Sequence, residues 1–271
     1  MIIDGRAIAK DILADVRARV ATLPDAPIVR AIVMSPSPAT LSYLAIKGAR
    51  AADAGMLLDV TRLPEDATED DIISAIKMPG ADAVIVQLPL PPHINERSVL
   101  DTIPVALDAD VLSTESYENF LAGKDGAVLP PVVSAVEIVL AGAGVDLKGK
   151  NIVVIGNGKL VGKPVQAWLE RFDARVKGIT SESEGENGLS LLKTADVVIS
   201  GAGSPGLITP DLLKDRVVVI DAGTSDSQGS VVGDADPACA EVASIFTPVP
   251  GGMGPVAVAC LFRNVAILLD R

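Results

Sequence analysis

The feature that most constrains this chain is the alternation of short aliphatic runs with helical segments along two stretches of the sequence. The runs are rich in Val, Ile and Leu and are bounded by Gly, Pro or charged residues, which is typical of buried strands. Alternation of this kind predicts an α/β fold with parallel sheets and right-handed crossovers. The predicted strands are residues 28–34, 57–63, 83–87, 151–155, 175–179, 196–200, 217–221 and 245–248.

Length and composition set the number of domains and argue against two classes of partner. At 271 residues the chain is long enough for two domains. Its apolar content of 49% supports a sizeable core, and an aromatic content of only 3% favours helix-covered parallel sheets over a β-sandwich. A net charge of −12 argues against nucleic acid or an anionic membrane as partner. A small anionic ligand is still possible, because it needs only local positive potential.

The cysteines and the N-terminus bear on the compartment. Cys239 and Cys260 are too few for a disulfide framework and their spacing matches no metal motif, so we expect two buried thiols and no metal site. The first residues resemble neither a signal peptide nor a transit sequence, and no apolar run approaches the ~20 residues of a spanning helix. We therefore expect a cytoplasmic protein.

Tyr43 and Lys47 form the first candidate functional pair. They lie four residues apart in a run, 41–55, whose alanines predict a helix that ends at a glycine cap. Side chains four residues apart share one face of a helix, so the phenol and the ammonium project together. On a solvated face the pair has no special chemistry. In a partly apolar cleft, a lysine can lose its proton near neutral pH and act as an acid, a base or an electrostatic anchor.

The order of the strands supports the cleft. Ligands of open parallel sheets bind beyond the carboxyl ends of the strands. Residues 38–47 and residues 87–92 both follow such strand ends. Gln87 therefore comes from a strand end neighbouring the one that precedes Lys47.

A glycine loop predicts a dinucleotide site in the second half of the chain. Gly156, Gly158 and Gly162 follow a predicted strand and precede a predicted helix at 163–171, with Pro164 in its first turn. The glycines let backbone N–H groups approach a pyrophosphate, whose charge a helix N-terminus favours. The spacing GxGxxxG is one residue longer than the usual fingerprint, so an ordinary tight strand–helix turn stays open as the alternative.

The segment after the next strand bears on the choice of cofactor. A carboxylate at Glu182 can accept hydrogen bonds from an adenosine ribose, whereas a 2′-phosphate would need Arg or Lys. Electrostatics there favour NAD over NADP without settling the preference. The candidate cofactor-binding residues are Gly156, Asn157, Gly158, Gly162, Thr180, Glu182 and Gly203.

These pieces occur in the same order in one known family, and the chain resembles bifunctional methylenetetrahydrofolate dehydrogenase/methenyltetrahydrofolate cyclohydrolase. Residues 38–47 (PATLSYLAIK) are similar to that family's P-A-S-x-x-Y-V-x-x-K. Residues 86–94 (VQLPLPPHI) are similar to its V-Q-L-P-L-P-x-H-I, and residues 247–255 (TPVPGGMGP) to its T-P-V-P-G-G-V-G-P. Shorter matches are residues 108–110 with D-V-D and residues 233–234 with the start of G-D-V.

The resemblance implies oxidation of 5,10-methylenetetrahydrofolate to the methenyl form by NAD(P)⁺, then hydrolysis to 10-formyltetrahydrofolate, in the one-carbon metabolism that serves purine biosynthesis. It implies a three-layer α/β folate domain, residues 1–115 completed by a C-terminal helix at 256–271. It also implies a Rossmann-type NAD(P)-binding domain at residues 116–255, an active site in the cleft between the two, and a homodimer.

The resemblance also implies roles for single residues. Lys47 would activate water or stabilise charge, and Gln87 would orient Lys47. Tyr43 would pack on the aminobenzoyl part of the folate, and Asp110 would bind the guanidine-like edge of the pterin. These residue types suit those tasks, because an aromatic face stacks on a ring and a carboxylate accepts two parallel N–H groups. Further implied substrate-binding residues are Gly251, Gly252 and Pro255.

The sequence departs from the family pattern mainly on the cofactor side. The family's G-R-S is GNG at 156–158, its C-H-S/R-x-T is replaced by ITSES at 179–183, and its P-C-T-P is PVVS at 131–134. Its D-G-F-H is DVLS at 110–113. Two alternatives to the bifunctional enzyme therefore stay open, a cyclohydrolase with a degenerate cofactor site and a folate-binding protein without turnover.

Two further polar residues invite a role. His93 is the only histidine, and we expect it to form a structural hydrogen bond rather than to act as a base. Asp221 ends an apolar strand. It could lie near the nicotinamide or simply cap the end of the strand, and the sequence leaves both roles open.

Overall fold

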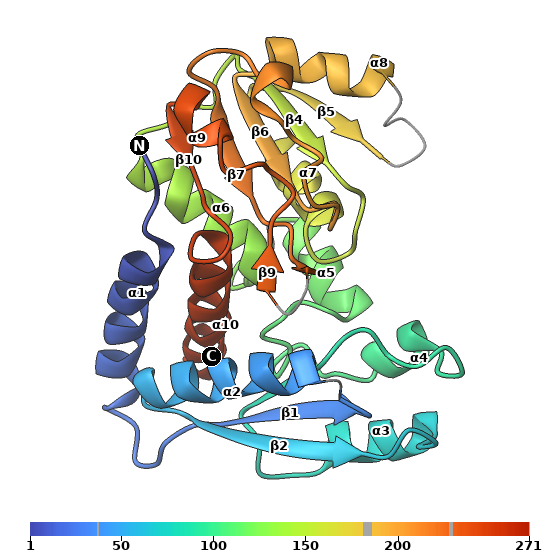
Figure 1. The fold of residues 1–271 in the computed structure, drawn as a ribbon. Coiled ribbons are helices and arrows are strands. Elements are labelled where there is room, and N and C mark those ends of the chain that lie inside the picture. Colours follow the sequence, from blue (N-terminus) through green and yellow to red (C-terminus); the bar gives the residue numbers. More distant parts are fainter. Residues whose placement is uncertain (37, 181–185, 228–229, 271) are drawn as a thin grey trace. The chain divides into compact units, whose positions relative to one another are not determined.

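The computed structural model of the protein describes residues 1–36, 38–180, 186–227 and 230–270. The chain divides into two compact units. The three-stranded unit consists of Lys10–Pro131 and Val258–Arg271, and the five-stranded unit consists of Met1–Ala9 and Val132–Ala257. Each unit is an α/β structure built on a parallel sheet, which confirms the predicted fold class (Figure 1). The domain limits at residues 115 and 255 stay predictions.

The three-stranded unit has its sheet in the order β2-β1-β3, with alternate residues of β1 facing opposite sides. Ala31 and Val33 pack with Leu44 of α2, whereas Ile32 and Met34 face the side that holds α3 and α4. Its elements are α1 (Gly5–Val20) from residue 10 onward, β1 (Ile28–Met34), α2 (Pro38–Asp53), β2 (Leu57–Leu63), α3 (Glu69–Lys77), β3 (Ala83–Val86), α4 (Glu96–Leu100), α5 (Thr114–Leu121) and the end of α10 (Met253–Leu269).

The five-stranded unit has its sheet in the order β10-β7-β6-β4-β5. One face buries Val153, Val198 and Val219 with residues of the short helices η1, η2 and α9, and α7 contacts β4 and β5. Its elements are α6 (Pro131–Gly142), β4 (Asn151–Ile155), α7 (Gly162–Leu169), β5 (Arg175–Ile179), α8 (Glu186–Leu189), η1 (Ser190–Thr194), β6 (Val197–Ser200), η2 (Pro210–Leu212), β7 (Val218–Asp221), β8 (Ser225–Ser227), β9 (Ser230–Val232), α9 (Cys239–Val242) and β10 (Ile245–Phe246).

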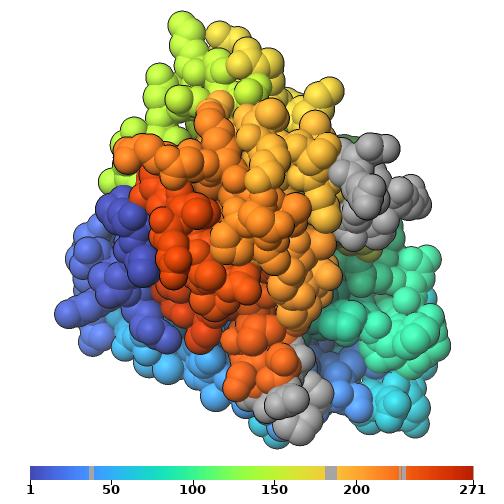
Figure 2. All heavy atoms as spheres, turned by 45° about the horizontal axis from the view of Figure 1, so that its top comes forward, coloured from blue at the N-terminus to red at the C-terminus, as the bar shows by residue number. Residues whose placement is uncertain are grey.

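The two edges of this larger sheet differ. At one edge the N-terminal residues lie against β10, where Ile2 forms a parallel bridge with Phe246 (Figures 1 and 2). The Met1 amino group donates to the backbone oxygen of Ser244 at 2.6 Å. At the other edge β5 has a strand partner on one side only, and most of its residues are exposed.

The helix that carries Tyr43 and Lys47 follows the prediction closely. It spans Pro38–Asp53, and Gly55 just beyond it has a φ of +77°. Glycine adopts this left-handed conformation without a steric penalty, so it ends the helix as expected.

The structure differs from what the sequence suggests at several places. The stretch 108–131 has a less regular pattern in the sequence, yet it contains α5. The sequence of residues 210–213 suggests a helix, but the structure has only a short 3₁₀ turn there, η2. Helix α4 and the antiparallel pair β8–β9 were not predicted. No helix among the described residues combines the length and apolar character that crossing a membrane requires.

Candidate active site

Lys47 lies in the third turn of α2 with only 5% of its surface exposed. Its Nζ donates to Oε1 of Gln87 at 3.1 Å. Gln87 directly follows β3, and its Nε2 donates to the backbone oxygen of Leu88 at 3.0 Å, which fixes the orientation of the amide. The two side chains, 40 residues apart in sequence, therefore meet as the strand-end argument predicted.

Tyr43 lies one turn before Lys47 and presents its ring to the amine. The Nζ of Lys47 is 5.0 Å from the ring centroid, within the range of a cation–π contact. Burial, and after it the negative charge of Asp110, raise the pKa of the Tyr43 phenol to about 12. With 41% of the residue still exposed, Tyr43 offers an aromatic surface that stays uncharged at neutral pH.

Asp110 lies in the loop before α5 and interacts electrostatically with both residues. Burial raises the pKa of its carboxyl group, the positive charge of Lys47 opposes this, and the negative charge of Asp108 adds to it. Within the described part of the chain, no donor forms a hydrogen bond with the Asp110 carboxylate. A partly buried carboxylate with unused acceptor capacity is suited to binding a ligand that carries N–H donors.

Burial lowers the pKa of Lys47, and the charge of Asp110 partly opposes this. The hydrogen-bond partner of the amine is the neutral amide of Gln87, and no carboxylate of the described residues forms an ion pair with it. The protonated form therefore lacks the close counter-charge that would hold it. Such an amine loses its proton more readily than an exposed lysine does, so it is suited to exchange a proton with a bound water molecule.

The glycine loop between β4 and α7 folds tightly on itself. Gly156 has a φ of +96°, and a Cβ atom there would lie 2.7 Å from the backbone oxygen of Gly201. A Cβ atom at Gly162 would lie 2.0 Å from the backbone oxygen of Gly156, so both positions require glycine. Asn157 and Gly158 are exposed, and a Cβ atom at Gly158 would meet nothing within 4 Å.

The start of α7 is compatible with a phosphate group. Its N-cap residue, Val161, has no side-chain oxygen to cap the first turn. Peptide N–H groups near such a helix start are free of side-chain capping and attract anions. The backbone of the loop therefore fits the pyrophosphate of a dinucleotide, although the arginine of the family pattern is absent.

The remaining predicted residues that the structure describes are all in the five-stranded unit. Thr180 directly follows β5, and Gly203, with a φ of +67°, lies in the loop after β6. Glu182 lies outside the described residues. The predicted substrate-binding residues are in the segment before and at the start of α10, namely Gly251 with a φ of +109°, Gly252 and Pro255.

Two buried carboxylates tie the ends of β6 and β7 to their loops. Burial raises the pKa of Asp221 to about 6; backbone hydrogen bonds oppose this, and the charge of Asp234 adds to it. Asp221 accepts from two backbone N–H groups, at 2.9 Å each, so it forms the strand-end contacts that one interpretation of the sequence expected. Asp234 accepts from the hydroxyl of Ser200 at 2.6 Å and from the backbone N–H groups of Ala202 and Ser204.

His93 and the cysteines have local roles. The Nε2 of His93 lies 3.1 Å from the backbone oxygen of Ala67. Cys239 and Cys260 are both buried thiols. Across the described residues, no group of three or more His, Cys, Asp or Glu side chains is arranged to hold a metal ion.

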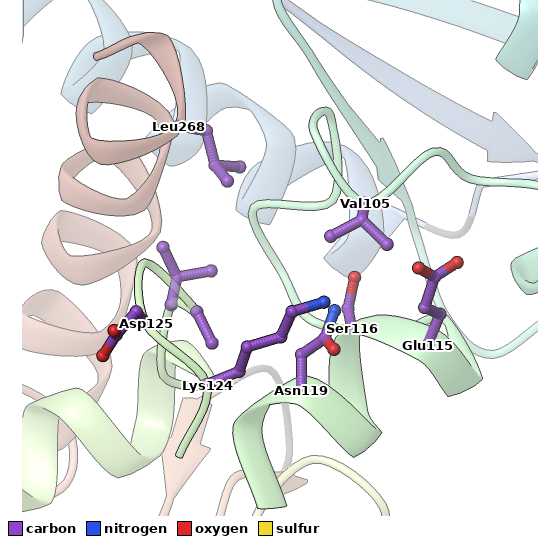
Figure 3. A pocket seen from close by; sticks show the side chains of 9 residues that line it. Val105, Glu115, Ser116, Asn119, Lys124, Asp125 and Leu268 are labelled. Carbon is purple, nitrogen blue, oxygen red and sulfur yellow. The ribbon is translucent and has the colours of Figure 1, made fainter. Parts of the chain in front are cut away.

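A small cavity of about 110 Å³ lies elsewhere in the three-stranded unit, between α5, the following loop and the end of α10 (Figure 3). Lys124 extends its side chain toward Ser116 and Asn119 there. None of the predicted site residues that the structure describes lines this cavity. It therefore belongs to a different part of the unit from the Lys47 group.

Sequence reasoning assigned no supporting role to three buried polar residues, although two of them lie in matched motifs. Asp108, Asn264 and Asp234 are buried and form hydrogen bonds to the backbone of loops. Only Ser113 carried a local signal, because a serine before a short polar helix is a preferred N-cap. It caps α5, accepting from the backbone N–H of Ser116.

The fold and the two sites together define a class of protein. One α/β unit holds a buried lysine with a neutral amide partner, an aromatic ring and an open carboxylate at the end of a parallel sheet. The other holds a glycine loop between a parallel strand and a helix, the usual position of a dinucleotide site. The class is that of two-domain α/β enzymes that use a nicotinamide cofactor.

Comparison with family models identifies the particular family. Residues 3–110 match the model described as tetrahydrofolate dehydrogenase/cyclohydrolase, catalytic domain. Residues 130–271 match the model described as tetrahydrofolate dehydrogenase/cyclohydrolase, NAD(P)-binding domain. The chain belongs to the tetrahydrofolate dehydrogenase/cyclohydrolase family, as its motifs indicated.

Individual relatives agree over the whole length. The chain is 37% identical over 272 residues to the bifunctional protein FolD of Heliobacterium modesticaldum, covering 97% of this chain and 94% of the relative. It is 34% identical over 276 residues to a bifunctional FolD of Thermus thermophilus, covering 100% and 97%. A Trypanosoma brucei methylenetetrahydrofolate dehydrogenase-cyclohydrolase, solved with NADP and an inhibitor, superimposes with a TM-score of 0.94 at 31% identity, covering 100% and 97%. The Campylobacter jejuni FolD structure gives 0.92 at 28% identity, covering 100% and 99%.

Proposed function

We propose that the protein oxidises 5,10-methylenetetrahydrofolate to the methenyl form with a nicotinamide cofactor and hydrolyses that product to 10-formyltetrahydrofolate. The observation that carries the proposal is the buried Lys47 amine, which is paired with the neutral amide of Gln87 and faces both Tyr43 and Asp110. Family membership and the full-length likeness to bifunctional relatives support both activities.

In the hydrolytic step, Lys47 acts on water. Its neutral amine accepts a proton from a water molecule as the water adds to the positively charged methenyl carbon, which gives a neutral carbinolamine. The resulting ammonium returns that proton to N5 as the C–N5 bond breaks, while the hydroxyl proton leaves to solvent and the formyl group stays on N10. Gln87 accepts a hydrogen bond from Lys47 and so holds the amine in place in either protonation state. Because Gln87 is neutral, it does not trap the amine as a permanent cation.

Two residues bind and orient the folate. Tyr43 packs its exposed ring against the aminobenzoyl group, and its phenol does not titrate near neutral pH. Asp110 accepts the paired N–H groups of the amino-pyrimidinone edge, which use the acceptor capacity that no described residue fills.

The glycine loop would hold the dinucleotide through Gly156, Asn157, Gly158 and the start of α7 at Gly162. When bound, the cofactor supplies a hydride acceptor for the oxidation of the methylene group. Thr180 and Gly203 would contact the adenosine side of the cofactor. We propose that NAD is preferred over NADP, because the family's basic positions in this loop and after β5 are replaced by uncharged or acidic residues.

The oligomeric state and location follow the sequence expectation, a cytoplasmic homodimer. The exposed edge strand β5 supports the dimer, since an unpaired edge is a surface that proteins cover or pair. Light scattering on the purified protein tests the dimer directly, and a monomer at micromolar concentration would refute it.

The test of the activities is an assay of methylenetetrahydrofolate oxidation with NAD and NADP side by side, together with hydrolysis of the methenyl compound. Lys47→Ala should lose hydrolysis while it keeps the circular dichroism and melting temperature of a folded protein. Hydrolysis at near-normal rates in that variant would contradict the role of Lys47. Calorimetry adds a second criterion, because absence of binding of either cofactor at millimolar concentration would leave only a cyclohydrolase.

A further inference from the structure

The loop that carries Asp110 is held by buried polar groups on both sides. Asp108, with 1% of its surface exposed, accepts from the backbone N–H of Leu112 at 3.0 Å and from that of Ser113 at 2.9 Å. The hydroxyl of Ser113 also donates to Asp108, at 2.7 Å. The carboxylate of Asp108 thus closes residues 108–113 into a ring around Asp110 and fixes its junction with α5.

The C-terminal helix α10 holds the same loop from another direction. Asn264, with 1% of its surface exposed, donates from Nδ2 to the backbone oxygen of Ala109 at 2.9 Å and to that of Leu129 at 2.8 Å. Both hydrogens of one amide are therefore used to hold two backbone segments. The first of these contacts joins residues 155 positions apart in sequence.

The backbone next to Asp110 is strained. Val111 has a φ of +56° and is 5% exposed. A β-branched residue in the left-handed region is a clear outlier, and such strain persists only where the surroundings impose it. The related family pattern has glycine at this position, which would adopt the conformation without strain. Here the contacts of Asp108 and Asn264 are what hold it.

We propose that Asn264 and Asp108 are positioning residues that fix the Asp110 carboxylate for the paired N–H donors of the substrate. Every polar side chain of this cluster is used within the protein except the carboxylate of Asp110, for which the described residues supply no donor. The inference rests on the proposed function, because it assigns these residues to the binding of that substrate. In this proposal neither Asn264 nor Asp108 touches the substrate, and both act by holding Asp110 in place.

The test is a double-mutant cycle on the hydrolysis of methenyltetrahydrofolate. Four proteins are compared: the parent, Asp110→Asn, Asn264→Leu and the double variant. Asn264→Leu keeps the size of the side chain but removes both donors. We expect it to raise KM about tenfold and to leave kcat within about twofold, because a displaced binding group weakens binding of ground state and transition state alike. In the Asp110→Asn background, Asn264→Leu should change KM by less than about twofold.

A structural control is available on the same helix. Leu268 is 5% exposed and lines the cavity near Ser116 and Lys124 (Figure 3). Leu268→Ala removes packing but no hydrogen bond, so it should lower the melting temperature while KM stays within about twofold of the parent. If Asn264→Leu does not fold, Ser113→Ala replaces it in the cycle. That variant loses one hydrogen bond to Asp108 and should raise KM about threefold, again only when Asp110 is present.

The outcomes distinguish a failure of the proposed role of Asp110 from a failure of the positioning role of Asn264 and Asp108. If Asp110→Asn leaves KM unchanged, the proposed role of Asp110 fails and the positioning role fails with it. If Asp110→Asn raises KM but Asn264→Leu does not, or raises it equally in both backgrounds, only the positioning role is overturned. An equal rise of KM in Leu268→Ala and Asn264→Leu at matched stability would likewise assign the effect to general destabilisation.

Discussion

Replacing Gln87 by glutamate tests whether Lys47 works in its neutral form. Glutamate has nearly the same shape as glutamine but would place a negative charge about 3.1 Å from the Lys47 amine. At an effective dielectric constant of about 20, two unit charges at this distance attract by about 5 kcal/mol. Burying the new carboxylate offsets part of this, and about 3 kcal/mol is a reasonable remainder. The added charge raises the pKa of Lys47, so the neutral fraction of the amine at pH 7 falls by about 100-fold.

The expected result of Gln87→Glu is a fall in kcat for hydrolysis of about 100-fold at pH 7, with partial recovery as the pH rises. The assay follows loss of methenyl absorbance at saturating substrate across a pH series, corrected for spontaneous hydrolysis. Gln87→Met is the matched control, since it removes the hydrogen bond without adding charge and should cost about tenfold or less. A Gln87→Glu enzyme with parental kcat at pH 7, or one whose rate does not recover with pH, would refute the neutral-amine mechanism.

Three further predictions concern stability and the cofactor loop. Below about pH 6 the folded protein holds a proton on Asp221, because burial raises the pKa of this carboxyl from 3.8 to about 6. The unfolded chain loses that proton near about pH 4, so the free energy of unfolding should fall by about 3 kcal/mol between about pH 4 and pH 6. Urea titrations across this pH range should show that the fall is absent in Asp221→Asn. If the free energy of unfolding changed equally with pH in both proteins, the prediction would be wrong. Gly162→Ala should cost about 3 kcal/mol or more, because its Cβ atom would lie 2.0 Å from a backbone oxygen, and Gly158→Ala should cost less than about 0.5 kcal/mol. Equal melting temperatures for the two would show that the loop is not packed as described. Arg30→Met should cost about 2 kcal/mol in urea unfolding, since the buried guanidinium donates to a side chain and two backbone oxygens, and an unchanged midpoint would show that these bonds contribute nothing net.

The part of the site that sequence could predict is the part built by regular structure. Helical spacing placed Tyr43 and Lys47 on one face of α2, and the rule that parallel strands end at a common edge brought Gln87 to them from 40 residues away. Both arguments need only local periodicity and chain order. They hold here because α2 and β3 are uninterrupted elements whose buried faces leave no freedom in their orientation.

The support of Asp110 could not be predicted because it depends on contacts that have no local signature. The bond from Asn264 to Ala109 is set by how α10 packs, which a single amide in an apolar helix does not reveal. Val111 is a β-branched residue that sequence alone would place in extended backbone, and only the surrounding contacts explain its positive φ. Helix α5 was missed for a different reason. It is short and mostly polar, and its Ser113 cap was the signal to use.

The charge of the protein limits how the cofactor site can work. A chain with a net charge of −12 repels anionic ligands at long range, and the phosphate loop has lost the arginine of the family pattern. The backbone N–H groups around Gly156 and the start of α7 can attract a pyrophosphate at short range, and Lys159 and Lys163 add positive charge to the same loop. A 2′-phosphate adds up to two more negative charges at a position where the sequence supplies Thr180 and an acidic segment instead of a base. NAD and NADP would form the same contacts with the glycine loop. The 2′-phosphate of NADP therefore adds electrostatic repulsion without adding an attractive contact. This is the reason for our proposal that NAD is preferred, and measured affinities for NAD and NADP would test it.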